Sequence, residues 1–378
     1  MKTDIVVIGG YGHVGSKISH ILGEVHPGKV YAAGRNLHRA EEFSRSTGGK
    51  VKPLQLSADL PLEPKLLEKV KLVIMCLDQQ DTRLAEACLQ SGTHYVDVSA
   101  SGDFLTMLQR LDPVEHNLKA AAVLSVGLAP GLTNLLAARA VQELDHTEQI
   151  GISIMLGLGD SHGQAAMEWT VDNLGADFEI TEHGRPRTVS SFTEATAADF
   201  GFDLRQHRAY RFPFSDQMTL PQILNVPSVS TRLCFDSRSM TSAAALLRRT
   251  GLSRLLRNRT LRNLAVQAFT RFRFGSERYA VKVDAYGRKD GRAASREYGI
   301  TGVHEASITA QTAAGVALRL YESAPSPGVY HIEQLFSLDS HGEQCSLIPS
   351  ASGGTGPSFR YPLEGMSIWT RSGRPSHA

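Results

Sequence analysis

Short apolar segments alternate with amphipathic segments over residues 1 to about 130. The runs at 5–8 and 71–77 are almost wholly apolar, which is typical of strands buried on both faces of a parallel sheet. The alternation predicts an α/β domain, a doubly wound parallel sheet covered by helices on both sides. The expected strands cover 5–8, 30–33, 51–56, 71–77, 95–98 and 122–126, and the expected helices cover 14–25, 37–47, 66–69, 82–91 and 104–121.

The pattern changes after Pro130. Segments 149–156 and 279–285 place apolar residues at every second position, as half-buried and antiparallel strands do. A second, α+β domain is therefore expected to begin near Leu132. The alanine-rich segment 305–320 predicts a long helix that packs back on the first domain. From 341 to 378 the chain is rich in Gly, Ser and Pro and lacks periodicity, so we expect an irregular tail.

A glycine motif follows the first expected strand directly. Gly10, Gly12 and Gly15 form G-x-G-x-x-G, with Tyr11, His13 and Val14 at the intervening positions. In this strand–turn–helix context the first glycine allows a tight turn, the second lets the backbone approach a pyrophosphate, and the third lets the helix pack on the strand. The helix N-terminus then offers N–H groups to the phosphates. The motif predicts a dinucleotide-binding domain.

The end of the second strand indicates which dinucleotide is bound. An NAD site places an acid there for the ribose 2′-hydroxyl, but this chain has Arg35 and Asn36. Because an arginine forms a charge-assisted pair with a 2′-phosphate, NADP(H) is the expected cofactor, with Asn36 and Arg39 as lesser candidates for the same phosphate. Other residues at the carboxyl ends of the strands are expected to line the cofactor: Asp59 on the adenine side, Leu77 and Asp78 near the ribose, and Ser99 and Gly127 near the nicotinamide, with Pro130 and Gly131 in the same segment as Gly127.

Composition adds limits to this interpretation. The chain has 378 residues, and its 40 basic and 38 acidic side chains leave a net charge of +2, so binding to nucleic acid by bulk charge is not expected. No window approaches the roughly 18 apolar residues of a membrane span, and the start shows no secretory leader, so a cytoplasmic protein is expected. The four cysteines are scattered and the histidines show no metal-ligand spacing, so neither disulfides nor a metal site is expected.

Arginine is concentrated in one part of the chain. Segment 246–274 carries eight arginines and no acid. A nucleic-acid or anionic-lipid surface is one interpretation. Leucines and alanines at helical spacing favour the other, a pair of amphipathic helices with a solvated basic side. The arginines are Arg248, Arg249, Arg254, Arg257, Arg259, Arg262, Arg271 and Arg273.

Several motifs together resemble the saccharopine dehydrogenase-like reductases. They are the glycine turn and segments 92–99, 127–134, 159–163 with Trp169, 210–217, 302–306 and 327–331. The resemblance implies a Rossmann domain interrupted by an α+β domain for substrate binding and dimerisation, with a nicotinamide cofactor and a homodimer. The boundaries would be 1–131 plus about 302–340 for the Rossmann domain and 132–301 for the insertion. Family members often reduce an imine formed from an amine and a carbonyl compound.

One position departs from that family. True saccharopine reductases carry an acid in a G-x-D-P-G stretch that helps to hold the substrate amino group, whereas this chain has Ala129 there. The departure speaks against saccharopine as the substrate.

The chain shows no obvious acid–base pair, and hydride transfer to a protonated iminium needs chiefly orientation. Five residues of the second domain are expected around the substrate. His162 is the best general acid by its side-chain pKa, Arg232 the best anchor for a carboxylate, and Trp169 a wall of the pocket. The alternatives are a core position for Trp169 and a helix or turn cap for Asp216. The five candidates are Asp160, His162, Trp169, Asp216 and Arg232.

Three functions remain open at this point. The first is an NADPH-dependent reductase of an imine, or a dehydrogenase running in reverse. The second reduces a C=C or C=O bond of a natural-product or carrier-bound intermediate, with segment 246–274 docking an acidic carrier protein. The third is a non-catalytic NADP-binding sensor or scaffold.

Overall fold

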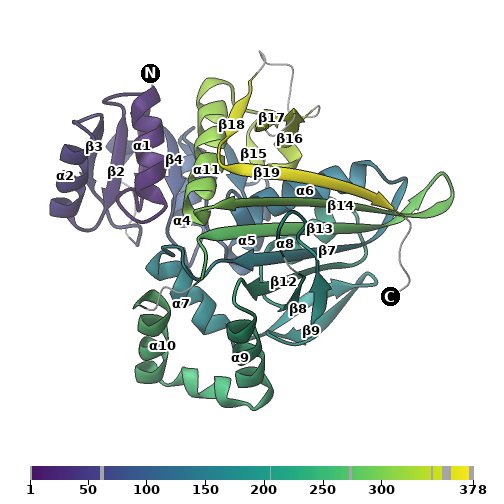
Figure 1. The fold of residues 1–378 in the computed structure, drawn as a ribbon. Helices are drawn as coiled ribbons and strands as arrows, with labels where there is room; N and C mark the ends of the chain where they lie inside the picture. The colour runs from purple at the N-terminus through teal and green to yellow at the C-terminus, as the bar shows by residue number, and fades with distance from the viewer. Residues whose placement is uncertain are drawn as a thin grey trace. The chain divides into compact units, whose positions relative to one another are not determined.

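The computed structural model describes residues 2–59, 64–204, 206–271, 275–341, 344–350 and 359–373 (Figure 1). The chain forms two compact units. The first comprises Met1–Leu132, Ala306–Asp339 and Ser346–Leu363, and the second comprises Thr133–Glu305, Ser340–Cys345 and Glu364–Ala378. Each unit has its own seven-stranded sheet.

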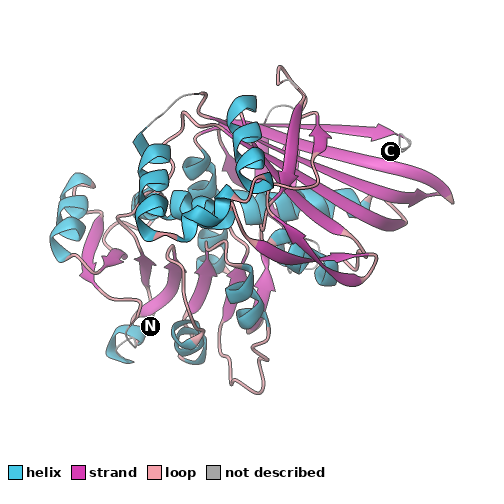
Figure 2. Ribbon diagram, turned by 90° about the horizontal axis from the view of Figure 1, so that it is seen from below, coloured by secondary structure: helices cyan, strands magenta, loops and turns pink. Residues whose placement is uncertain are grey.

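The first unit is a parallel α/β domain. Its strand order is β15-β6-β5-β4-β1-β2-β3, every neighbouring pair is parallel, and helices lie on both faces of the sheet (Figure 2). The predicted fold class is confirmed. The strands are β1 (Asp4–Ile8), β2 (Val30–Gly34), β3 (Val51–Gln55), β4 (Val70–Met75), β5 (His94–Asp97), β6 (Ala121–Leu124) and β15 (Gly328–His331). The helices are α1 (Gly15–Val25), α2 (Leu37–Ser46), α3 (Pro64–Leu67), α4 (Arg83–Gln90), α5 (Gly102–Gln109), α11 (Glu305–Glu322) and α12 (Ile332–Leu335).

The centre of this sheet accounts for the continuous apolar runs. Ile5, Val7 and Ile8 of β1 and Leu72 and Ile74 of β4 are fully buried. A strand covered by helices on both faces has no solvated side, so its apolar residues do not alternate with polar ones.

Helix α5 is shorter than the sequence pattern predicts. The expected helix runs over 104–121, whereas α5 ends at Gln109. Pro113 disfavours helical backbone at the residue before it. The Asp112 carboxylate accepts the N–H groups of Val114 and Glu115, which holds this stretch as a turn.

The second unit has a mixed sheet. Its order is β10-β11-β12-β7-β13-β14-β19, in which β12 runs parallel to β7 and the other pairs are antiparallel. Helices α6 and α8 pack against this sheet. The strands are β7 (His146–Leu156), β10 (Thr196–Ala198), β11 (His207–Arg211), β12 (Val229–Phe235), β13 (Arg278–Lys289), β14 (Arg292–Val303) and β19 (Met366–Gly373), with β8 (Asp177–Glu182) and β9 (Arg185–Ser190) as a separate hairpin. The helices are α6 (Thr133–Gln142), α7 (Gln164–Asn173), α8 (Asp216–Ile223), α9 (Arg238–Arg249), the 3₁₀ helix η2 (Leu252–Arg257) and α10 (Arg259–Arg271).

The expectation of an irregular tail over 341–378 is wrong for most of its described part. Strands β16 (Phe336–His341), β17 (Gln344–Pro349) and β18 (Tyr361–Leu363) form a small sheet, and β19 pairs with β14. The pairing depends on a distant contact. A Cβ at Gly299 would lie 2.2 Å from Cε2 of Trp369, so the bare glycine makes room for the indole. The Trp369 Nε1 donates to the carbonyl of Phe200 at 2.8 Å.

Three further properties bear on the choice of chemistry. The four cysteines are free thiols. The described residues contain no cluster of three or more His, Cys, Asp or Glu side chains placed to hold a metal ion. None of the described helices combines the length and hydropathy that a membrane-spanning segment needs.

Candidate functional site

The turn between β1 and α1 requires its glycines for steric reasons. A Cβ at Gly10 would lie 2.5 Å from the carbonyl oxygen of Val7, and a Cβ at Gly15 would lie 2.2 Å from that of Gly9. The Ser19 hydroxyl donates to the Gly10 carbonyl at 2.9 Å and ties α1 to the turn. The residue preceding α1 provides no side-chain cap, so no capping side chain competes with a phosphate for the N–H groups of the first turn. The turn therefore fits a dinucleotide pyrophosphate.

Tyr11 connects this turn to the end of β2. Its hydroxyl accepts the backbone N–H of Asn36 at 2.9 Å, and the ring occupies the space that a side chain at Gly34 would need, with its hydroxyl 2.3 Å from such a Cβ. The guanidinium of Arg39 lies 5.3 Å from the centre of the Tyr11 ring. These contacts hold the ends of β1 and β2 in a defined geometry.

Arg35, at the end of β2, is a basic residue whose guanidinium these contacts do not use. It is exposed, and its guanidinium forms no hydrogen bond or ion pair with a described residue, although its carbonyl accepts Nε2 of Gln55 at 3.2 Å. Asn36, predicted as a phosphate ligand, uses its side-chain oxygen to cap α2 by accepting the N–H of Arg39 at 3.1 Å. A 2′-phosphate beside Arg35 would complete a charge pair that the protein itself does not supply.

The other predicted cofactor residues of this edge differ in their surroundings. The Leu77 side chain lies against the glycine turn, since a Cβ at Gly9 would be 3.1 Å from its Cδ2. Asp78 is exposed. Asp59 is also exposed and accepts the Ser57 hydroxyl at 3.4 Å. Packing against the glycine turn thus fixes the position of Leu77. The contacts of Asp59 and Asp78 within the protein do not indicate a ligand.

The turn after β6 is held by backbone and side-chain contacts. The N–H of Leu132 donates to the Gly127 carbonyl at 2.9 Å, and the Thr309 hydroxyl accepts the N–H of Leu128 at 3.3 Å. Pro130 is buried, and Gly131 has φ 140°, a value that side chains disfavour. These contacts give the predicted residues 127–131 one defined backbone path.

Asp97 is a residue of this edge that the sequence analysis did not single out. It ends β5, is fully buried, and accepts the Tyr95 hydroxyl and the N–H of Ser99, both at 2.8 Å. Burial raises the pKa of Asp97 to about 6, although these hydrogen bonds oppose the shift. The predicted cofactor residue Ser99 is therefore positioned through its backbone by Asp97. Its place at the carboxyl end of a buried strand is a signal that could have identified Asp97.

A second missed pair lies at the ends of β6 and β15. The Ser125 hydroxyl and Nδ1 of His331 are 2.8 Å apart and both residues are buried. Burial lowers the pKa of His331 to about 4, so the ring is neutral at physiological pH. Its Nε2 is buried without a hydrogen-bond partner among the described residues. A buried polar atom at the ligand-binding edge of a parallel sheet fits a role in holding a bound group.

In the second unit, the predicted catalytic residues Asp160 and His162 lie in one cluster with Glu305. Nδ1 of His162 lies 3.1 Å from Oε2 of Glu305, and Nε2 lies 2.9 Å from the carbonyl of Gly157. Burial disfavours the charged ring, but these two acceptors outweigh it and raise the pKa of His162. Asp160 accepts the N–H groups of Ser161 at 2.7 Å and Glu305 at 2.8 Å. Both predicted residues are thus committed to protein partners.

Trp169 and Asp216 belong to a different cluster. The Trp169 ring packs against Phe212 and Phe214, with centroid distances of 5.2 and 5.3 Å. Asp216 is fully buried and accepts the Thr231 hydroxyl at 2.5 Å, which joins α8 to β12. Burial raises the pKa of Asp216 to about 6. Trp169 is only partly buried, and the N-cap residue of α8 is Ser215, which provides no side-chain cap. The roles of Trp169 and Asp216 at the substrate stay predictions.

Arg232 lies opposite Arg211 across the β11–β12 pair. Its guanidinium donates to the Glu194 carbonyl at 3.1 Å and to the Ser230 hydroxyl at 2.7 Å. Burial, followed by the charge of Arg211, lowers the pKa of Arg232 to about 10. The neighbouring Arg211, in contrast, lies 2.9 Å from the Glu194 carboxylate. Among the described residues no hydrogen bond or ion pair joins Arg232 to His162, Asp160 or Trp169.

The parallel sheet and the glycine turn at its carboxyl edge define an NAD(P)-binding domain of the Rossmann type. Residues 5–123 match the family model of the saccharopine dehydrogenase NADP binding domain. The first unit is therefore similar to the NADP-binding domain of saccharopine dehydrogenases.

Solved structures share the fold over most of the chain. Apo saccharopine dehydrogenase (L-Glu forming) from Saccharomyces cerevisiae is 13% identical with a TM-score of 0.62, and the match covers 87% of this chain and 94% of that one. Homospermidine synthase from Legionella pneumophila, in complex with NAD, is 11% identical with a TM-score of 0.59, covering 88% of this chain and 87% of that one. At these identities the likeness concerns the fold. No curated protein sequence matches the chain.

Proposed function

We propose that the protein is an NADPH-dependent reductase of imines formed from an amine or amino acid and a carbonyl compound. The observation that carries this proposal is that His162 and Asp160 are committed to protein partners, Glu305 and nearby backbone. Asp216 is fully buried, with Oδ1 accepting the Thr231 hydroxyl and Oδ2 without a hydrogen-bond partner among the described residues. A protonated iminium needs no proton from the protein in order to accept a hydride, whereas a ketone needs a proton on its oxygen. The substrate that suits these residues already carries its proton.

NADPH is the cofactor that the end of β2 favours. Arg35 is exposed without an ion-pair partner among the described residues, and the strand ends in Gly34 followed by Arg35, where an NAD site has an acid. The guanidinium of Arg39, held over the Tyr11 ring, adds a second positive charge nearby. An added 2′-phosphate therefore gains charge-assisted hydrogen bonds that NADH lacks.

Each part of the chain has a defined task in this reaction. The turn at Gly10–Gly15 binds the pyrophosphate through its backbone, and Tyr11 keeps the end of β2 beside it. The bound nicotinamide supplies the hydride. Among the described residues no acidic side chain is in hydrogen-bonding contact with the Arg232 guanidinium, which suits a substrate carboxylate. The reaction converts iminium and NADPH into amine and NADP⁺.

The test uses 2-keto acids with and without amines. We expect NADPH to be consumed only when both are present, and deuterium from 4-deuterated NADPH to appear on the carbon of the new C–N bond, as read by mass spectrometry. Ketones and enones without amine are the comparison. Turnover of a ketone or an enone alone, at the rate seen with amine, would contradict imine reduction and favour C=O or C=C reduction.

A further inference from the structure

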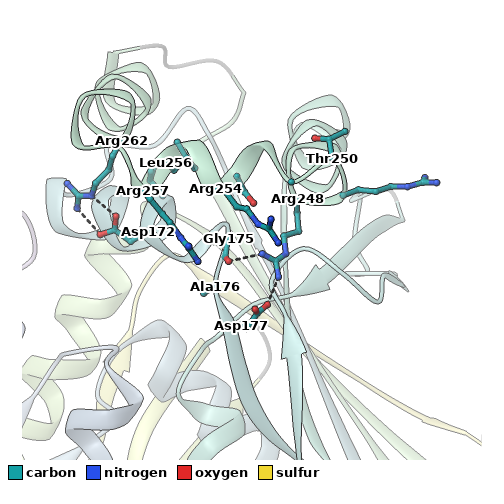
Figure 3. Close-up of a pocket in the computed structure, with 14 residues that line it drawn as sticks. Asp172, Gly175, Ala176, Asp177, Arg248, Thr250, Arg254, Leu256, Arg257 and Arg262 are labelled. Carbon is teal, nitrogen blue, oxygen red and sulfur yellow. Dashed lines mark hydrogen bonds and ion pairs between the residues drawn. The ribbon is translucent and has the colours of Figure 1, made fainter.

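The arginine-rich part of the second unit encloses a pocket of about 780 Å³. Its walls are the end of α9, the 3₁₀ helix η2, the first turns of α10 and the residues between α7 and β8 (Figure 3). Pockets that hold small molecules span roughly 300–1,000 Å³. The space is therefore large enough for an organic ligand, and neither the fold nor the proposed reaction uses it.

Two arginines that line this pocket are neutralised by ion pairs with aspartates. Arg262 pairs with Asp172 through Nη2 and Oδ2 at 2.7 Å, and Arg248 pairs with Asp177 while donating to the Gly175 carbonyl at 2.8 Å. These ion pairs attach α10 and α9 to the residues on either side of Gly175. They account structurally for two of the arginines in the segment.

Arg254 and Arg257 are not accounted for in this way. Both are exposed, and neither forms a hydrogen bond or ion pair with a described residue. They are three residues apart on η2, and side chains at this spacing eclipse each other along a 3₁₀ helix. Figure 3 shows both side chains directed into the space above Gly175 and Ala176, between the two ion pairs. Two guanidinium groups are thus presented together on one side of the pocket.

The local sequence contains no acid that could neutralise this charge. Residues 237–276 include no Asp or Glu. The lining includes Arg248, Arg249, Arg254, Arg257 and Arg262 but only Asp172 and Asp177 as acids, which leaves an excess of positive charge. Asp177 pairs with Arg248 and its charge also reaches Arg254, so a bound anion would compensate only the positive charge that remains.

We propose that this pocket binds a phosphoryl group. A phosphate monoester carries about 1.5 to 2 negative charges at neutral pH, which matches the two unpaired guanidinium groups of Arg254 and Arg257. The planar donor fork of arginine suits phosphate oxygens in bidentate contacts. The phosphoryl group belongs either to a soluble phosphorylated metabolite or to a lipid headgroup, since both present the same tetrahedral anion.

Exposed leucines on the same elements are a reason to test a lipid headgroup separately from a soluble ligand. Leu246, Leu252, Leu255, Leu261 and Leu264 are between 41% and 59% exposed. Basic residues interspersed with exposed apolar ones are characteristic of surfaces that contact anionic membranes. A soluble ligand, in contrast, needs only the pocket.

The experiment compares the full-length protein with the Arg254→Gln/Arg257→Gln double variant. Calorimetry with inorganic pyrophosphate, in the presence of saturating NADPH that occupies the glycine turn, tests the soluble source. Flotation with phosphatidylcholine vesicles, with or without phosphatidic acid, tests the lipid source. We expect the protein to bind pyrophosphate or the phosphatidic acid vesicles, and the double variant to bind the same probe at least about tenfold more weakly. Because both arginines are exposed, the double variant should fold normally.

The matched control is Arg259→Gln, an exposed arginine of the same segment that does not line the pocket. It should bind as the unmodified protein does. The proposal is overturned by three results: neither probe binds, the double variant retains full binding, or Arg259→Gln weakens binding as much as the double variant. The last result would reveal a diffuse charge attraction instead of a pocket.

Discussion

The Ser125 hydroxyl and Nδ1 of His331 lie 2.8 Å apart although 206 positions separate the two residues in sequence. The contact joins β6 to β15, a strand of the first unit that follows the residues of the second unit in the sequence. A neutral, buried imidazole at this edge of the sheet has a measurable consequence for stability.

Stability should fall when the pH is lowered from about 6.5 to 4. The pKa of His331 is about 4 in the folded protein and about 6.5 in an unfolded chain. Between these values the unfolded state binds more protons, so stability is full above pH 6.5 and is lost as the pH falls. The contribution is at most about 3 kcal/mol. Urea unfolding at pH 7.5 and pH 4.5 measures it.

Replacement of the imidazole separates this effect from general acid denaturation. His331→Gln should reduce the difference in unfolding free energy between the two pH values. His38→Gln should leave it unchanged, because the His38 side chain is 73% exposed. An unaltered pH dependence in His331→Gln would show that another group is responsible.

Gly15→Ala should weaken dinucleotide binding. The added Cβ would lie 2.2 Å from the Gly9 carbonyl oxygen, so the turn must move and lose its shape for a pyrophosphate. NADPH fluorescence titration should show at least about a tenfold weaker Kd. Gly151→Ala is the control, since no atom lies within 4 Å of its Cβ position. Equal affinity in the two variants would refute the assignment of the turn.

Arg35→Asp should reverse the choice of cofactor. The variant loses the charge-assisted pair with a 2′-phosphate and gains an acid for the ribose hydroxyl. We expect the Kd for NADPH to rise about tenfold or more and the Kd for NADH to fall, as measured by fluorescence titration. Arg45→Asp, at an exposed position in the last turn of α2, should change neither. A proportional loss of both cofactors in Arg35→Asp would rule out phosphate recognition by this residue.

Thr231→Val should destabilise the protein more at pH 8 than at pH 5. The Thr231 hydroxyl donates to Asp216, whose pKa is about 6, so the lost hydrogen bond matters most when the carboxylate is charged. The expected cost is about 1–3 kcal/mol at pH 8. Thr312→Val is the control, because its hydroxyl donates to the Ile308 carbonyl and does not depend on pH. Equal costs at both pH values in Thr231→Val would mean that Asp216 does not change its charge between pH 5 and pH 8.

More of the structure of the first domain than of the second could be predicted from the sequence. The buried runs of β1 and β4 and the spacing of Gly10, Gly12 and Gly15 are local patterns, and each predicts its structure without knowledge of the rest of the chain. Strand β19 had no such pattern, because it lies along β14 and its Trp369 packs on the distant Gly299.

By itself, the sequence determined the parallel sheet, the dinucleotide turn and the basic residue at the end of β2. These features follow from the order of apolar runs, glycines and charges over a few dozen residues. Only the tertiary structure decided which polar groups are paired, because the partners lie far apart: 143 positions separate His162 from Glu305, and 71 separate Arg248 from Asp177. Pairing of charges that lie far apart in the sequence depends on chain topology, and local pattern carries no information about it.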